Sequence, residues 1–200
     1  MHKTFGALAA GALILAGCEA LPGPSAGSAA AAPALPSGYT CCNLHYENDW
    51  ISDANWTSMP MIPAGASIKV LDYGRYRVHA EIDGRKMRLG LDYGRQQPLE
   101  VWARKIVVAD DPRRKIASWP APVRDAVRAG KVTMGMSKEQ VLVSLGYPPM
   151  HQTPSLDARQ WKYWHTSLGS FLVVWDAAGR VKEVIADPQT RYGVVHEPTR

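Results

Sequence analysis

Three cysteines are the most reactive side chains of the sequence, and two of them, Cys41 and Cys42, are neighbours. A disulfide between neighbouring cysteines is rare, because the bridge favours a larger Cα separation than one peptide bond allows. A metal site would need further ligands, and the sequence has no second cysteine pair. We therefore expect one of the two to be buried as a small apolar residue. A thiol catalyst that uses the nearby His45 is the alternative.

The third cysteine, Cys18, ends an apolar segment near the start of the chain. Phe5–Gly17 contains no charged residue and follows a short, positively charged start. It is shorter than the ~20 apolar residues that a membrane span needs, and it suits the apolar part of an export signal. The residues just before Cys18 are small, and a thiolate is a far better nucleophile than a hydroxyl. The pattern predicts a signal peptide over residues 1–17 and a modified thiol at Cys18.

The stretch Leu15-Ala16-Gly17-Cys18 resembles the lipobox of bacterial lipoproteins. The resemblance implies that a diacylglycerol is attached to the Cys18 thiol, that a peptidase cuts before this residue, and that its new amino group is acylated. Two or more acyl chains anchor a protein stably to a membrane without a spanning helix. The residue after the cysteine is Glu19 rather than Asp, and by the resemblance this favours the outer membrane, on its periplasmic face.

Residues 18–38 are almost all Ala, Pro, Gly and Ser after the cysteine and its neighbour, which predicts a flexible tether. The whole chain carries a formal net charge of +5. A basic surface can contact anionic lipid headgroups or an acidic protein face. Nucleic acid is not an expected partner of an exported lipoprotein.

The sequence lacks the usual motifs of catalytic and cofactor sites. It contains no H-E-x-x-H metal motif, no G-x-S-x-G nucleophile elbow and no glycine-rich phosphate loop. His165 lies in a Trp-rich stretch and is expected to be a packed or edge histidine. We expect a protein without enzymatic activity, metal or cofactor, apart from the lipid on Cys18.

A first domain is predicted over residues 39–110. Apolar and polar residues alternate from Ser67, and Asp83-Gly84 between two such runs indicates a hairpin turn. A further strand is predicted at residues 100–108, and a strand, an Asn-Asp turn and a strand are predicted within "NLHYENDWISD". Several short strands without a helical pattern predict a small antiparallel barrel.

The pentapeptide "LDYGR" occurs twice in this domain, at Leu71–Arg75 and Leu91–Arg95. The residues around the two copies do not match, and a local role explains both: a strand end, an Asp that bonds to the turn, and a Gly with positive φ. The alternative is a recognition surface. It would be formed by Tyr73, Arg75, Tyr93 and Arg95.

The stretches "CNLHYENDWISDANW" and "MIPAGASIKVLDYG" resemble bacterial SH3-like domains. There the "IPAG" step introduces a strand. The resemblance covers roughly residues 39–108 and implies a barrel with an aromatic groove that binds peptides or cell-wall material.

Residues 111–121, with their charges and prolines, are predicted to link this domain to a second one over residues 122–187. A helix is predicted at Pro122–Ala129. Ser137 and Gln140 form the pattern of a capping box for a second helix, which Gly146 and Pro148 end. Strands are predicted at 160–165, 171–175 and 180–186, with both helices on one face of the sheet. Residues 188–200 are predicted to be a loose tail.

Five stretches of this second domain form a pattern known from a protein family: Gly135–Val141, Leu145–Pro148, Trp161–Tyr163, Val173–Trp175 and Gly179–Val181. On these stretches the domain resembles the BamE/SmpA/OmlA family. The resemblance implies an outer-membrane lipoprotein that assists the machinery inserting β-barrels. It assigns mainly structural roles to Gly135, Ser137, Gln140, Gly146, Pro148 and Trp161.

The sequence thus predicts the α+β class, with a small SH3-like antiparallel β-barrel followed by a two-layer ααβββ BamE-like sandwich. The leading functional hypothesis is a non-enzymatic outer-membrane lipoprotein that binds envelope proteins, including the β-barrel assembly machinery. One alternative is a peptidoglycan-binding lipoprotein that acts through the SH3-like domain. Another is an inhibitor-type binding module, because the ααβββ scaffold also resembles β-lactamase inhibitory domains.

Overall fold

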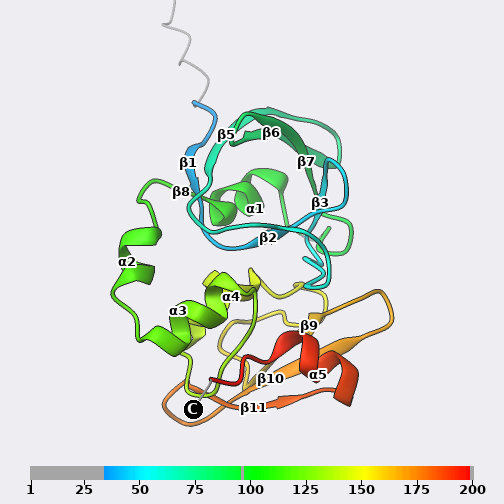
Figure 1. The fold of residues 1–200 in the computed structure, drawn as a ribbon. Coiled ribbons are helices and arrows are strands. Elements are labelled where there is room, and N and C mark those ends of the chain that lie inside the picture. Colours follow the sequence, from blue (N-terminus) through cyan, green and yellow to red (C-terminus); the bar gives the residue numbers. More distant parts are fainter. Residues whose placement is uncertain (1–33, 96, 199–200) are drawn as a thin grey trace, which may run out of the picture. The chain divides into compact units, whose positions relative to one another are not determined.

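The structure is a computed structural model that describes residues 34–95 and 97–198. Within these residues, three β-sheets and five helices form a mixed α+β fold (Figure 1). The predicted signal peptide, Cys18 and most of the predicted tether lie outside these residues. The end of the predicted tether belongs to the fold, because strand β1 begins at Ser37.

The largest sheet has six strands and curls around helix α1 (Figure 1). Its strand order is β3-β7-β6-β5-β1-β8, and all neighbours are antiparallel except β3 and β7, which run parallel. This sheet is therefore not the purely antiparallel barrel that was expected. The strands are β1 (Ser37–Thr40), β3 (Trp50–Ser52), β5 (Ser67–Tyr73), β6 (Arg77–Ile82), β7 (Arg85–Gly90) and β8 (Val107–Val108).

The turn predicted at Asp83-Gly84 is confirmed. It joins β6 to β7, and both residues have positive φ, 45° and 78°. The Asn-Asp turn is also formed, by paired backbone hydrogen bonds between Glu47 and Trp50. Its flanking strands do not pair as one hairpin, however. Strand β2 (Leu44–His45) pairs with β4 (Met61–Ile62), whereas β3 pairs with β7.

The strand predicted at residues 100–108 is wrong over most of its length. Helix α1 spans Leu99–Ile106, and only Val107–Val108 form a strand. Trp102, Ala103 and Ile106 are buried against the six-stranded sheet. Their spacing fits the 3.6-residue period of a helix, and this packing outweighs the β propensity of the segment.

The second sheet has the order β11-β10-β9 and is antiparallel. Alternate residues point into one core, including Trp161, Tyr163 and Phe171, and the same core contains residues of the helices. The predicted order of helix, helix, strand, strand, strand is therefore confirmed. The elements are α3 (Ala121–Arg128), α4 (Lys138–Leu145), β9 (Gln160–Trp164), β10 (Ser170–Trp175) and β11 (Val181–Ile185).

The predicted capping box of α4 is confirmed, because the Ser137 side chain accepts a hydrogen bond from Gln140 N, and the Gln140 side chain accepts one from Ser137 N. Gly146 caps the other end, with φ 76° and ψ −173°. The φ is positive, which glycine adopts readily, but this ψ lies outside the left-handed helical region. The Asn55 amide approaches Gly146 so closely that a Cβ there would clash.

Two segments that were expected to be irregular contain helices. The predicted linker contains α2 (Arg113–Ala117), and buried Trp119 after it joins the second core. The predicted tail contains α5 (Pro188–Val194), which begins with a side-chain cap from Asp187. Both helices are too short to show a periodic pattern, so tertiary contacts decide them.

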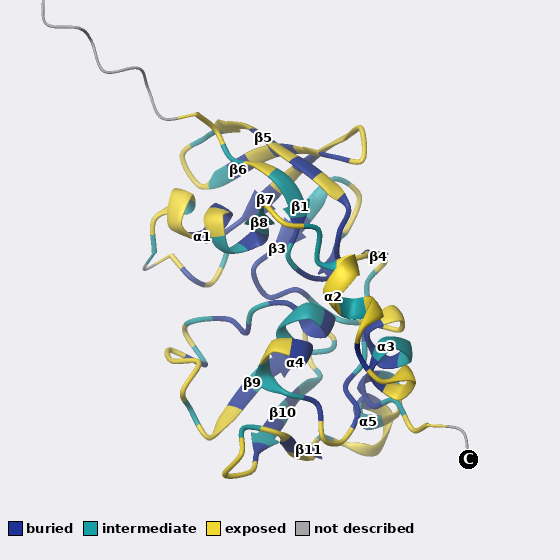
Figure 2. Cartoon of the chain, turned by 90° about the vertical axis from the view of Figure 1, so that its left-hand side faces the viewer, coloured by how far each residue is buried: buried dark blue, intermediate teal, exposed yellow. Residues whose placement is uncertain are grey.

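Figure 2 shows buried segments in both core regions. Two buried asparagines, Asn43 and Asn55, join these regions by hydrogen bonds. Asn55 has a backbone φ of 45°, and its side chain donates to Asn43 O and Leu145 O and accepts from His45 N.

Hydrogen bonds also occupy both outer strands of the second sheet. Thr57 N donates to Trp164 O of β9, and Gly135 N donates to Val181 O of β11.

Candidate functional site

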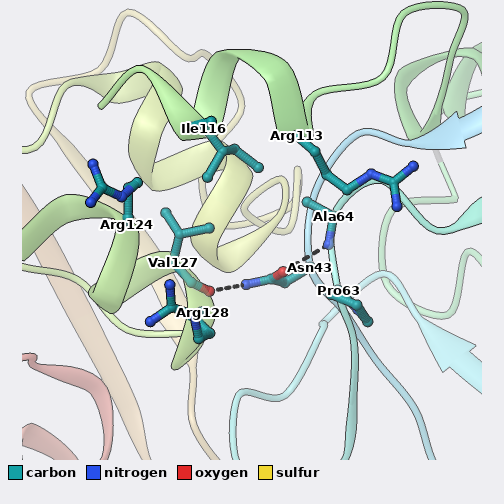
Figure 3. A pocket seen from close by; sticks show the side chains of 9 residues that line it. Asn43, Pro63, Ala64, Arg113, Ile116, Arg124, Val127 and Arg128 are labelled. Atoms are coloured by element: carbon teal, nitrogen blue, oxygen red, sulfur yellow. Dashed lines mark hydrogen bonds between the residues drawn. The ribbon is translucent and has the colours of Figure 1, made fainter. Parts of the chain in front are cut away.

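A groove of about 440 Å³ lies between the β4–β5 loop and helices α2 and α3 (Figure 3). Its floor is apolar and its rim is basic. The floor consists of Pro63, Ala64, Ile116, Ala117 and Val127, and the rim consists of Arg113, Arg124 and Arg128. We call these eight residues, with Asn43, the arginine-rimmed groove.

Helix α3 supplies two of the three arginines because of its amphipathic pattern. Val123, Ala126 and Val127 are buried in the second core. Arg124 and Arg128 are four residues apart, so they project from the same side of the helix. Pro120, at the N-cap of α3, begins the helix with an extended backbone (φ −56°, ψ 148°).

Asn43 holds the wall of the groove in place. Its Nδ2 donates to Val127 O at 2.7 Å and to Ser144 O at 3.0 Å, and its Oδ1 accepts from Ala64 N at 2.9 Å (Figure 3). The residue is 1% exposed, so these bonds replace water that cannot reach it. One amide thus connects the floor from both sides, and the groove is formed before any ligand arrives.

Each rim arginine donates at least one hydrogen bond within the chain. The Arg113 guanidinium binds both carboxylate oxygens of Asp111, and this bond lowers the pKa of Asp111. Arg128 Nη1 donates to Asp125 at 2.8 Å. Arg124 Nη1 donates to Trp119 O at 2.7 Å and forms no ion pair with any described residue. A guanidinium has five N–H donors, so each arginine keeps donors for a ligand.

The groove offers binding chemistry rather than reaction chemistry. Its lining contains no hydroxyl, thiol, imidazole or carboxylate. It provides apolar surface, positive charge and planar donors that match carboxylate or phosphate groups.

The four residues of the predicted recognition surface lie in three places. Arg75 and Arg95 both lie over the Tyr76 ring, at 4.9 and 5.7 Å from its centroid, and line a second concavity of about 340 Å³. Tyr73 lies next to α1, where burial and the nearby Glu100 raise its pKa.

Tyr93 lies apart from this concavity. Its ring stacks on His151 with centroids 5.5 Å apart, and it meets Trp56 edge-on at 6.3 Å. The structure therefore brings the two arginines together around Tyr76, a residue that the repeated motif does not contain.

The remaining candidate reactive residues are two cysteines and two histidines, and their contacts indicate structural roles. Cys41 and Cys42 form a disulfide, which differs from the expectation that neighbouring cysteines stay unbridged. Neither sulfur is then a free nucleophile for a catalyst with His45. His45 is buried, and burial followed by the charge of His165 lowers its pKa to about 4. His165 Nδ1 lies 2.9 Å from Thr57 Oγ1.

Sequence reasoning missed the arginine-rimmed groove, although part of its signal was visible. The charged and proline-rich stretch around Arg113 was interpreted as a linker. The helix predicted at Pro122–Ala129 contains Arg124 and Arg128, but the sequence assigned them no binding role. Neither pattern shows that Asn43 and the loop at Pro63 complete a concavity with them.

Residues 34–95 and 97–198 contain no group of three or more His, Cys, Asp or Glu side chains arranged to hold a metal ion. Within these residues, no helix has the length and apolar character to cross a membrane. No family model, curated protein or solved structure matches the chain.

Proposed function

We propose that this chain is a non-enzymatic outer-membrane lipoprotein, anchored through Cys18, that binds other envelope proteins at the periplasmic face. The arginine-rimmed groove is the observation that carries the proposal. It combines an apolar floor with arginines, which are enriched where proteins recognise one another. The lipobox-like stretch at residues 15–18 supports the anchor.

The finer proposal is an SH3-like module followed by a BamE-like module that assists β-barrel insertion. Two observations support it. The curled six-stranded sheet precedes the α3, α4, β9, β10, β11 order. The motif residues Ser137, Gln140 and Gly146 cap α4, while Trp161 lies fully buried in the second core.

Crosslinking in intact cells tests the protein-binding role. A photoreactive residue at Ala117, on the groove floor, is expected to yield protein adducts that mass spectrometry identifies as envelope components. The matched control is the same residue at Ala178, which is exposed in the β10–β11 turn. If position 117 gives no adducts above position 178, binding at the groove is rejected. Adducts only with proteins outside the barrel-insertion machinery reject the narrower proposal.

Replacing the lipidated residue tests the anchor separately. Radiolabelled palmitate should label the wild-type chain and not Cys18→Ser. Label on the variant would contradict attachment at this thiol.

Peptidoglycan binding is a second candidate, favoured by the concavity at Tyr76. Two arginines flank an exposed aromatic ring there, and cell-wall peptides carry carboxylates that arginines bind. Sedimentation with purified peptidoglycan should remove the wild-type chain from solution, and Arg75→Glu with Arg95→Glu should leave it there. Equal sedimentation of both proteins would reject this site.

A further inference from the structure

The arginine-rimmed groove has a charge pattern that selects among ligand classes. Four arginines lie at or beside it, because Arg114 follows Arg113 in α2. Only two carboxylates, Asp111 and Asp125, pair with these arginines within the described residues. The region therefore carries an excess of positive charge, and Arg124 is the rim residue without an acidic partner among those residues. An occupant with negative charges would complete the rim.

The arrangement of the arginines favours an elongated occupant over a compact one. Figure 3 shows Arg124 and Arg128 on one side of Ile116 and Val127, and Arg113 on the other. A single phosphate group is bound best where donors converge on one point. Here the guanidinium groups point apart, so they suit several separate anions along a chain.

Because the floor of the groove is apolar, a matching occupant also carries apolar groups between its negatively charged groups. Val127 is buried, while Ile116 is only partly covered and Ala117 is exposed. A volume of about 440 Å³ lies within the range of sites that enclose a small organic ligand. The same volume can receive one or two aliphatic side chains. Because Asn43 already fixes the wall, little ordering is required when they enter.

We propose that the groove binds an acidic peptide segment of a partner protein, in which one or two aliphatic residues are flanked by Asp or Glu. This inference rests on the proposed protein-binding function and specifies its ligand. The aliphatic side chains contact Ile116, Ala117 and Val127, and the flanking carboxylates bind the three rim arginines.

Fluorescence anisotropy with the full-length chain in detergent tests this proposal. The probe is a labelled peptide with two central Leu residues and four Glu residues on each side. Binding should weaken as salt concentration rises, because exposed charges are screened. Replacing all Glu by Gln, or both Leu by Ser, should each weaken binding by about tenfold or more, since both kinds of contact contribute. Equal binding of all three peptides would overturn the proposal.

Variants of the chain locate the binding. Arg124→Glu and Arg128→Glu should each reduce affinity for the acidic peptide by about tenfold or more. Ala117→Trp should also reduce it, because the indole fills an exposed part of the floor. The matched control is Arg159→Glu, an exposed arginine outside the groove, which should bind as the wild type does. Wild-type affinity in both Arg124→Glu and Ala117→Trp would overturn the site.

Vesicles test the competing ligand class. Two proteins without the anchor, Cys18→Ser and Cys18→Ser with Arg124→Glu, are floated with vesicles containing phosphatidylglycerol. Both should bind the vesicles to the same extent. Vesicle binding that depends on Arg124, without peptide binding, would replace the peptide with a lipid headgroup. If the peptide fails but crosslinks from Ala117 persist, the protein-binding function stands and only the acidic ligand is rejected.

Discussion

His45 is the most perturbed histidine of the described residues. It lies where β2 meets the second core region, and its Nδ1 has no hydrogen-bond partner there. Burial disfavours the charged imidazolium, and the nearby His165 adds to the effect, so the pKa falls from 6.5 to about 4. The native protein therefore holds His45 neutral at pH values where an unfolded chain would protonate it.

This shift predicts a loss of stability in mild acid. The unfolded chain takes up a proton as pH falls through 6.5, whereas the native chain resists until about pH 4. The stability that neutral His45 contributes is fully present above pH 6.5. It is lost as pH falls towards 4, which lowers the free energy of unfolding by about 3 kcal/mol. Urea unfolding at several pH values measures the slope. His45→Gln should flatten it, and His79→Gln, at an exposed position, should retain it. A wild-type slope in His45→Gln would contradict this assignment.

At the scale of elements, local chemistry determines the ends of α4. The hydroxyl of Ser137 satisfies one of the N–H groups that the first turn leaves unpaired. Ser137→Ala should lower the free energy of unfolding by about 1 kcal/mol, measured by urea denaturation. Ser167→Ala, in an exposed loop, serves as the control and should change it by less than about 0.5 kcal/mol. Equal stability of both variants would show that the cap is replaceable.

The difference between local signals and tertiary packing explains which elements the sequence could predict. The turn at Asp83-Gly84, the capping box at Ser137 and the three strands of the second sheet depend on signals within a few residues, and all are present. Helices α1 and α5 depend on tertiary packing. Trp102 packs against the curled sheet, and Thr190 and Val194 are buried against distant residues.

The candidate site was unpredictable for a related reason. Asn43 and Val127 are 84 positions apart, yet one hydrogen bond joins them. No spacing rule connects such residues. The two site predictions came from local patterns. The lipobox-like stretch at residues 15–18 lies outside the described residues, and the four residues of the repeated motif lie in three places.

At the scale of the whole molecule, buried amides couple the two cores. Asn55 donates one hydrogen bond across their boundary, to Leu145 O, and its two other hydrogen bonds hold it to Asn43 O and His45 N on its own side. The wild-type chain should therefore unfold in one transition, with coincident urea curves from tryptophan fluorescence and far-UV circular dichroism. Asn55→Gly keeps the positive φ but removes the amide, so it should lower stability by about 2–4 kcal/mol and separate the curves.

The control for this coupling is Asn48→Gly, because Asn48 has a similar φ of 55° in an exposed turn. It should leave the curves coincident. Separate transitions in the wild-type chain would contradict coupling through Asn55.

The occupied edges of the second sheet affect how the protein behaves at high local concentration. Thr57 and Gly135 already bond to its outer strands. An exposed strand is a template on which another chain can add, and repeated addition produces fibrils. Molecules held at high local concentration meet this hazard often. The bonds at Trp164 and Val181 cover one end of each outer strand, so a neighbouring copy finds a shorter free edge there on which to add.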